Sequence, residues 1–430
     1  MKKIFYSLVC AMVALASCKP TGNNGPVIVN PGDILVNKNE VLDADIQKQK
    51  LEQVANKSLT VFDSKEFKDL AELCDMFYSH ADRYYTADNY DWSDLEYAGE
   101  DIWEDLYSEK KRSDYKWEMT YTLFLSNCTG VVTFGKKAAT YDRSDETKVV
   151  FENIEGENWE ATLVSKNLKE VYLGEWVETY YYDQYEDKYE VTVEVPESLV
   201  FQVKKGDESI AKVTAMFDYS ISEGGVDYEQ DRIGVSLEIQ VDDVVVKLSK
   251  MSADAKTGAL SYDVTVMKNG MFVASQKVSS VVDYDLDVED RYIVDGDVDA
   301  ATVSIETNIL GEVQFKGTCS NMIKLADIVD QNYDTQKQAE RAAEKALELM
   351  DMAIYYDGTS QVQAKIEFEP VADLDYYGNV YGYYLEPVIV FWDESRYLFY
   401  EYFEDGDFDD FLDNLEDFLY DYEEMVEGIN

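Results

Sequence analysis

The sequence is poor in histidine, proline and positive charge. Its 430 residues include one histidine, His80, six prolines, and 38 Lys and Arg against 88 Asp and Glu, for a formal net charge of −50. A single histidine excludes histidine triads, two-histidine zinc sites and histidine-based proton shuttles. A charge this negative repels phosphates, which excludes nucleic-acid binding as the main function.

Sequence motifs of common enzyme classes are also missing. The chain has no Gly-x-Ser-x-Gly, no Walker loop and no dinucleotide-binding glycine pattern. The paired carboxylates of a glycoside hydrolase give no signal, because 88 acids guarantee that some pair lies at a suitable distance. We therefore predict that the protein is not an enzyme, and an acid-pair hydrolase is the least favoured alternative.

Apolar and aromatic side chains are abundant. Apolar residues make up 46% of the chain and aromatic residues 13%, with 34 tyrosines. Disordered acidic segments carry far fewer such residues. The chain can therefore bury a large core.

The first eighteen residues carry the most specific motif. A cationic start, Met1-Lys2-Lys3, precedes an apolar run and then Leu15-Ala16-Ser17-Cys18. This pattern resembles the lipobox of bacterial lipoproteins. The resemblance implies that residues 1–17 are a signal peptide cleaved after Ser17, and that Cys18 carries diacylglycerol and an acylated amino terminus. An ordinary secretory signal with a chance cysteine is the alternative.

The lipid would be the only membrane attachment, because no later segment reaches eighteen consecutive apolar residues. Residues 18–38 contain half of the prolines and are expected to form a flexible tether. This tether, followed by a Tyr- and Asp-rich body, resembles envelope lipoproteins of the Bacteroidetes. In that group surface display tends to follow acids placed just after the cysteine. The first acid here is Asp33, which favours the periplasmic face of the outer membrane over the cell surface.

The hydrophobic periodicity predicts an α+β fold, in which a large antiparallel meander sheet is packed against helices from both termini. Residues 39–112 are expected to be a helical segment, with a long loop as the alternative for 81–112, and 113–325 show period-two alternation with frequent turn signals. Asn269-Gly270 is the strongest hairpin signal. Residues 326–430 are expected to be an α+β segment closing the same body, with a helix from Thr335 to about Ala353 and an amphipathic helix at the C-terminus.

Cysteines give little further information. After cleavage and lipidation Cys74, Cys128 and Cys319 remain, so at most one disulfide can form. Cys128 and Cys319 both lie in expected strand regions. Their pairing is left open, with free thiols as the alternative.

Two kinds of side-chain cluster are candidate binding sites. Tyrosine clusters suit sugar stacking or protein recognition, although cross-strand pairing in exposed hairpins also explains them. Acidic clusters with period two or EF-hand-like spacing are candidate metal sites, although a solvated sheet face and helix capping explain them better. The tyrosines are Tyr180, Tyr181, Tyr182, Tyr376, Tyr377, Tyr383 and Tyr384, and the acids are Asp283, Asp285, Asp287, Asp405, Asp407 and Asp409. No cofactor is expected, apart from loosely bound Ca²⁺ attracted by the charge.

These observations predict a lipid-anchored, non-enzymatic envelope protein that binds a hydrophobic ligand on a curved sheet. The expected architecture is similar to that of periplasmic lipoprotein carriers, in which the concave face of the sheet holds acyl chains. A surface module that binds a glycan or an envelope protein through its tyrosine-rich hairpins is the alternative.

Overall fold

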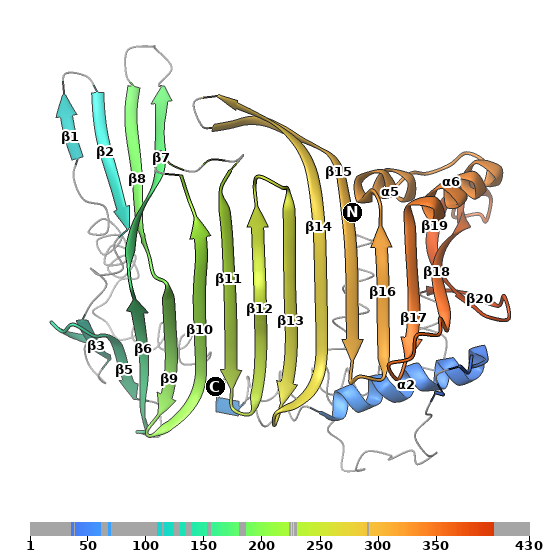
Figure 1. Cartoon of the computed structure of the whole chain (residues 1–430), viewed down its shortest axis with the longest axis horizontal. Helices are drawn as coiled ribbons and strands as arrows, with labels where there is room; N and C mark the ends of the chain where they lie inside the picture. The colour runs from blue at the N-terminus through green and yellow to red at the C-terminus, as the bar shows by residue number, and fades with distance from the viewer. Residues whose placement is uncertain are drawn as a thin grey trace.

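A single large sheet dominates the molecule. The computed structural model describes residues 36–61 except 38, 68–69, 110–113, 116–123, 130–134, 139–152, 156–179, 186–289 except 223, 224, 226, 228 and 229, and 292–399. Sixteen strands form the sheet (Figure 1). In hydrogen-bonded order they are β20 (Arg396–Leu398), β19 (Val380–Phe391), β18 (Ala364–Leu374), β17 (Met350–Tyr356), β16 (Val313–Cys319), β15 (Tyr292–Ile309), β14 (Met271–Glu289), β13 (Ala259–Lys268), β12 (Val244–Asp254), β11 (Arg232–Val241), β10 (Glu208–Ser220), β9 (Ser198–Lys205), β6 (Asn158–Lys166), β5 (Thr147–Glu152), β3 (Gly130–Phe134) and β4 (Ala139–Asp142).

Four more strands form a small second sheet. Their order is β1 (Lys110–Ser113), β2 (Lys116–Leu123), β8 (Glu186–Val195) and β7 (Lys169–Thr179). The predicted large antiparallel sheet is confirmed. The expectation that every strand pairs antiparallel is wrong at two places, because β2 pairs with β8 and β3 pairs with β5 in parallel. Strand β4 continues β3 as a hairpin, so β5 must return on the other side of β3 in the same direction.

Four of the five connections between the long strands β9 to β14 are turns of two to four residues, which is why these strands form a meander, and the connection from β10 to β11 is longer. Asn269 and Gly270 between β13 and β14 have φ values of 51° and 72°, as a type I′ turn requires. The turn before β13 includes Gly258, with φ of 65°, and a Cβ atom there would lie 2.0 Å from the carbonyl oxygen of Val282. Only glycine fits this position, because the neighbouring strand approaches the turn so closely.

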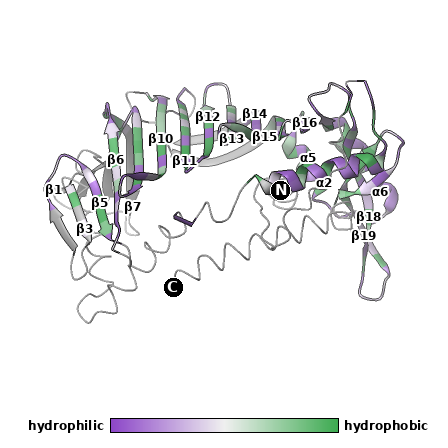
Figure 2. Ribbon diagram, turned by 90° about the horizontal axis from the view of Figure 1, so that it is seen from below, coloured by the Kyte–Doolittle hydropathy of each residue, from purple (hydrophilic) through white to green (hydrophobic). Residues whose placement is uncertain are grey.

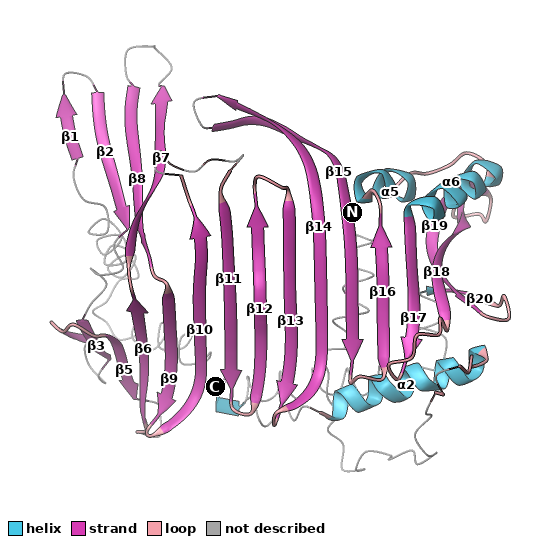
Figure 3. Ribbon diagram, in the orientation of Figure 1, coloured by secondary structure: helices cyan, strands magenta, loops and turns pink. Residues whose placement is uncertain are grey.

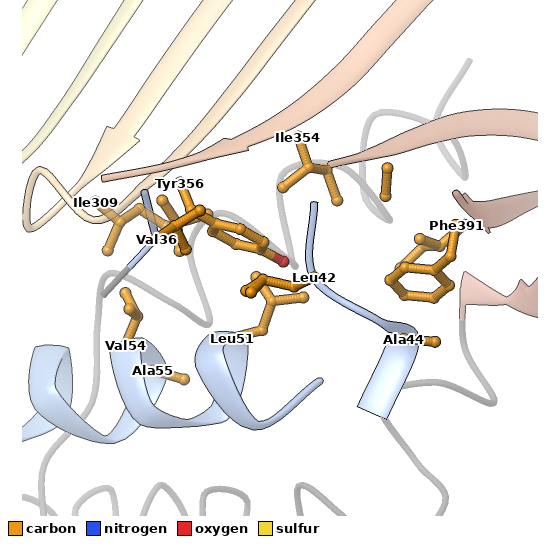
Figure 4. Close-up of a cluster of buried hydrophobic side chains, with 13 residues drawn as sticks. Val36, Leu42, Ala44, Leu51, Val54, Ala55, Ile309, Ile354, Tyr356 and Phe391 are labelled. Carbon is orange, nitrogen blue, oxygen red and sulfur yellow. The ribbon is translucent and has the colours of Figure 1, made fainter. Parts of the chain in front are cut away.

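All three named helices lie on one face of the sheet, at the end formed by β15 to β19. The helices are α2 (Ala44–Thr60), α5 (Met322–Val329) and α6 (Gln336–Leu349), drawn in cyan in Figure 3. Leu51 and Val54 of α2 pack on Ile354 of β17, and the alanines of α6 pack on Phe368 of β18 and Leu385 of β19. Figure 4 shows the cluster under α2, with Tyr356 between helix and sheet. Seen from below, the strands follow an arch, and the helices lie on its inner side (Figure 2).

Buried polar groups fix α2 in place. The Lys50 side chain is 0% exposed, and its Nζ lies 2.9 Å from Glu312 Oε2 and 3.0 Å from Asp357 Oδ1. Gln47 Nε2 donates to the carbonyl oxygen of Gln363 at 2.9 Å. Burial opposes ionisation of Glu312, but the hydrogen bond and charge of Lys50 hold the pKa of Glu312 below its usual value. A buried lysine needs such partners, so α2 has one defined position on the sheet.

The C-terminal zone departs from the sequence prediction in two ways. The capping box of Thr335 and Gln338 is present, but α6 ends at Leu349 rather than near Ala353. Residues from Met350 onward form β17, because Met350 pairs with Cys319 of β16. Helix α5, capped by Asn321, was not predicted. The helix expected at the C-terminus lies outside the described residues.

Candidate ligand-binding face

The two faces of the large sheet differ in chemistry. Residues directly opposite each other on neighbouring strands share a face, so the strand register assigns every side chain. One row across β10 to β15 consists of Phe217, Val235, Met251, Tyr262, Val278 and Ile305. A second row consists of Val213, Ile239, Val246, Val266, Ala274 and Ile309. Ile309 packs against α2, which places both rows on the face that carries the helices.

We call this surface of β6 and β9 to β15 the apolar face. Leu163, Phe201, Leu237, Leu248 and Val264 extend it between and beyond the two rows. Each strand contributes through simple alternation: in β10 Val213, Ala215 and Phe217 share the apolar face, while Lys212, Thr214 and Asp218 lie on the other side. Helices α5 and α6 contact β15 and β17 to β19. None of the three named helices lies over β10 to β13 (Figure 1). The two described helical residues 68–69 lie near the end of β9, where Asp69 pairs with Lys205.

The opposite face, here called the polar face, carries cross-strand ion pairs. They are Lys148–Glu160 at 2.5 Å, Arg232–Asp218 at 2.9 Å, Lys316–Glu306 at 3.1 Å, and Lys247–Glu238 and Lys277–Asp263 at 3.6 Å. Such exposed pairs contribute about 0–1 kcal/mol each to stability. They keep one side of an open sheet in water, and the sheet therefore has one side suited to solvent and one suited to hydrocarbon.

Three polar side chains at the centre of the apolar face, those of Tyr262, Gln276 and Thr307, are hydrogen-bonded to one another. Tyr262 Oη donates to Gln276 Oε1 at 2.6 Å, and Gln276 Nε2 donates to Thr307 Oγ1 at 3.3 Å. Burial raises the pKa of Tyr262, so its hydroxyl stays neutral. This chain of hydrogen bonds crosses three strands without presenting a charge.

Charged groups on this face gather at one end of the strands. Trp159 is fully buried, with its ring 6.1 Å from that of Phe151, and Lys205 Nζ lies 5.3 Å from the Trp159 ring centroid. Lys205 also pairs with Asp69 Oδ1 at 3.2 Å. Lys268, on the same edge, is buried. At the opposite end of the face, called the open end below, the side chains of Ile233, Met251 and Leu260 are exposed.

The structure separates the predicted tyrosines. Tyr376 and Tyr377 lie almost fully in solvent at the tip of the β18–β19 hairpin, whereas Tyr383 and Tyr384 are half-buried in β19. Tyr383 pairs through its backbone with Tyr333 at 2.7–2.8 Å. Burial, with help from the nearby charges of Glu386 and Asp373, raises the pKa of Tyr384. Of the four predicted binding tyrosines in this hairpin, only Tyr376 and Tyr377 are therefore fully available to a ligand. Tyr180, Tyr181 and Tyr182 lie outside the described residues.

The acidic clusters provide no metal site in the described part of the chain, where no group of three or more His, Cys, Asp or Glu side chains is placed to hold an ion. Asp283 is an exposed residue of β14. The backbones of Asp285 and Asp287 pair with those of Asp297 and Asp295 across the β14–β15 hairpin. Asp405, Asp407 and Asp409 lie outside the described residues. Cys319 is a buried free thiol, so the pairing left open for it is not formed.

Comparisons with family models, curated proteins and solved structures found no match. None of the described helices is long and apolar enough to cross a membrane. The apolar face is therefore identified from the strand register and its side chains alone. Sequence reasoning did not single out its residues, although the signal was present as alternation in each strand and needed only the strand order to be assembled.

Proposed function

We propose that the protein is a lipid-anchored, non-enzymatic envelope protein that binds long acyl chains on the apolar face. The observation that carries this proposal is the contrast between the two faces, since β9 to β15 are apolar on one side and charged on the other. The surface is large. Eight neighbouring strands at ~4.8 Å spacing give a width of roughly 34 Å, and a ten-residue strand spans about the same length.

Acyl chains fit this surface better than a folded protein partner does. The central part of the face offers hydrocarbon and a hydrogen-bonded chain whose donors and acceptors already have partners. A folded partner would have to bring a rigid and equally apolar surface. An acyl chain needs only to leave water, which stabilises it by about 0.8 kcal/mol per buried CH₂ group.

The anchor and location follow from the lipobox resemblance. Cys18 would hold the protein in the outer membrane, with the body in the periplasm and the cell surface as the alternative. An outer-membrane lipoprotein beside a bilayer has acyl chains as its nearest hydrophobic ligands. The polar face and the net charge would keep the body soluble.

Chain-length dependence of binding tests this function. Fatty acids of increasing length are titrated into leaderless protein carrying Cys18→Ser, purified and stripped of lipid. We expect the affinity to rise by roughly threefold to fourfold per added CH₂ group, as burial of each group at about 0.8 kcal/mol requires. Affinity independent of chain length, or no binding, would overturn the proposal.

A further inference from the structure

The hairpin between β18 and β19 ends in an exposed aromatic tip. Tyr376, Tyr377 and Tyr381 are 97%, 85% and 81% exposed, and the flanking Leu374 and Val380 are exposed as well. We call these five side chains the aromatic tip. Large apolar side chains gathered in this way on the surface of a soluble body mark an interaction site.

The tip is held in a fixed shape. Asp375 accepts hydrogen bonds from the backbone nitrogens of Tyr377 and Asn379, both at 2.8 Å, and from Asn379 Nδ2 at 2.9 Å. Gly378 takes a φ of 81° to close the turn. The turn therefore satisfies its own backbone groups, so the backbone that carries the aromatic rings keeps its shape without a binding partner.

The ring geometry favours a lipid interface over a glycan. The rings of Tyr376 and Tyr377 meet edge to face, with centroids 5.5 Å apart and planes at 85°. Perpendicular rings give no flat platform for a sugar. Tyrosine does suit the boundary between lipid and water, because its ring is apolar and its hydroxyl stays hydrated.

The tip and the tether can reach one bilayer. The backbone nitrogen of Val36 donates to Asp357 Oδ2 at 2.8 Å, so the tether leaves the body near the start of β18. The eleven residues of β18 place the tip roughly 37 Å away. Seventeen residues, the number from 19 to 35, can span at most about 60 Å, at about 3.3–3.6 Å per residue.

We propose that the aromatic tip inserts into the interface of the bilayer that holds the anchor, and so sets the orientation of the body on the membrane. This inference rests on the proposed lipid anchor, and it assigns membrane contact to the aromatic tip rather than to the apolar face. The surface it fits is zwitterionic, since the negative charge of the protein repels anionic lipid.

Depth-dependent quenching tests the proposal. An N-terminal His tag in place of Cys18 tethers the protein to vesicles of phosphatidylethanolamine, phosphatidylcholine and a nickel-chelating lipid. We expect Tyr377→Trp to add emission that is blue-shifted and that brominated phosphatidylcholine quenches by about half, relative to wild type. The matched control is Met216→Trp, which lies on the polar face and is expected to add unquenched emission.

Each outcome decides. Equal quenching of both variants, or of neither, overturns the proposal. The proposal is also overturned if soluble peptidoglycan fragments shift the emission of the Tyr377→Trp variant and vesicles do not. That result would assign the tip to glycan binding. Fatty-acid binding is measured on the same proteins, so persistence of binding without quenching would refute only the membrane contact.

Discussion

The open end of the apolar face provides a quantitative test of ligand binding. Ile233, Met251 and Leu260 lie on neighbouring strands β11, β12 and β13, and their side chains are 54%, 54% and 45% exposed. If acyl chains cover this face, the exposed half of each side chain leaves water only when the ligand binds. Replacement of all three by serine removes that gain.

The expected loss follows from burial. Full burial of a side chain of this size stabilises by ~1.5–3 kcal/mol, so the remaining half is worth roughly 1 kcal/mol per residue. Three residues give about 3 kcal/mol, which is a roughly 100-fold weaker Kd. The free energy of unfolding of the ligand-free protein should fall only modestly, because the sites are already half exposed.

A matched control separates ligand contact from a general effect on the sheet. Val164, Met216 and Val281 are 47%, 59% and 52% exposed but lie on the polar face. Their triple serine variant loses similar β propensity. We expect it to bind a long-chain fatty acid with wild-type affinity in a fluorescence displacement assay. Equal affinities of the two triple variants would falsify the assignment of the ligand to the apolar face.

Three further predictions concern the scaffold. Lys50→Met should lower the free energy of unfolding by about 3 kcal/mol in urea titration, because it removes the fully buried ammonium group and leaves part-buried Asp357 without this cation and Glu312 with Lys57 alone. Lys57→Met should cost less than about 1 kcal/mol, because Lys57 is exposed and Lys50 still pairs with Glu312. Because the pKa of Glu312 is lowered in the folded state, its carboxylate stabilises the protein above the ordinary carboxyl pKa, and this stabilisation is lost as the pH falls through the folded-state pKa. The free energy of unfolding should therefore depend less steeply on pH in Glu312→Gln than in the wild type, and an unchanged slope would contradict this. Gly258→Ala should destabilise by several kcal/mol but Gly270→Ala by only about 1 kcal/mol, since both have positive φ and only Gly258 also meets a neighbouring backbone; similar melting temperatures would refute that reason.

Much of the fold could be predicted because its signals are local. The alternation of β9 to β14, the turn at Asn269-Gly270 and the capping box at Thr335 each act within a few residues. The error at the end of α6 came from a competition between two periods. Met350 and Ala353 fit the helical stripe, but Met350, Met352, Ile354 and Tyr356 also alternate, and pairing with β16 decided for the strand.

The binding face was harder to predict because it depends on strand order. A row such as Phe217, Val235, Met251 and Tyr262 draws one residue from each of four strands, and no single strand reveals it. The parallel pairs β2–β8 and β3–β5 were missed for the same reason. The tyrosines of the β18–β19 hairpin were identified as a cluster, but only the turn made by Asp375 shows which of them face solvent.

The central claim is that the apolar face holds acyl chains, and native mass spectrometry tests it most directly. The unlipidated mature chain is purified from bacteria without detergent and compared with the triple serine variant at Ile233, Met251 and Leu260. The account predicts additional masses of lipid size on the wild-type protein, which ordinary organic extraction removes, and a much smaller bound fraction on the variant. A wild-type protein that carries no lipid and takes up none from added fatty acid would contradict it.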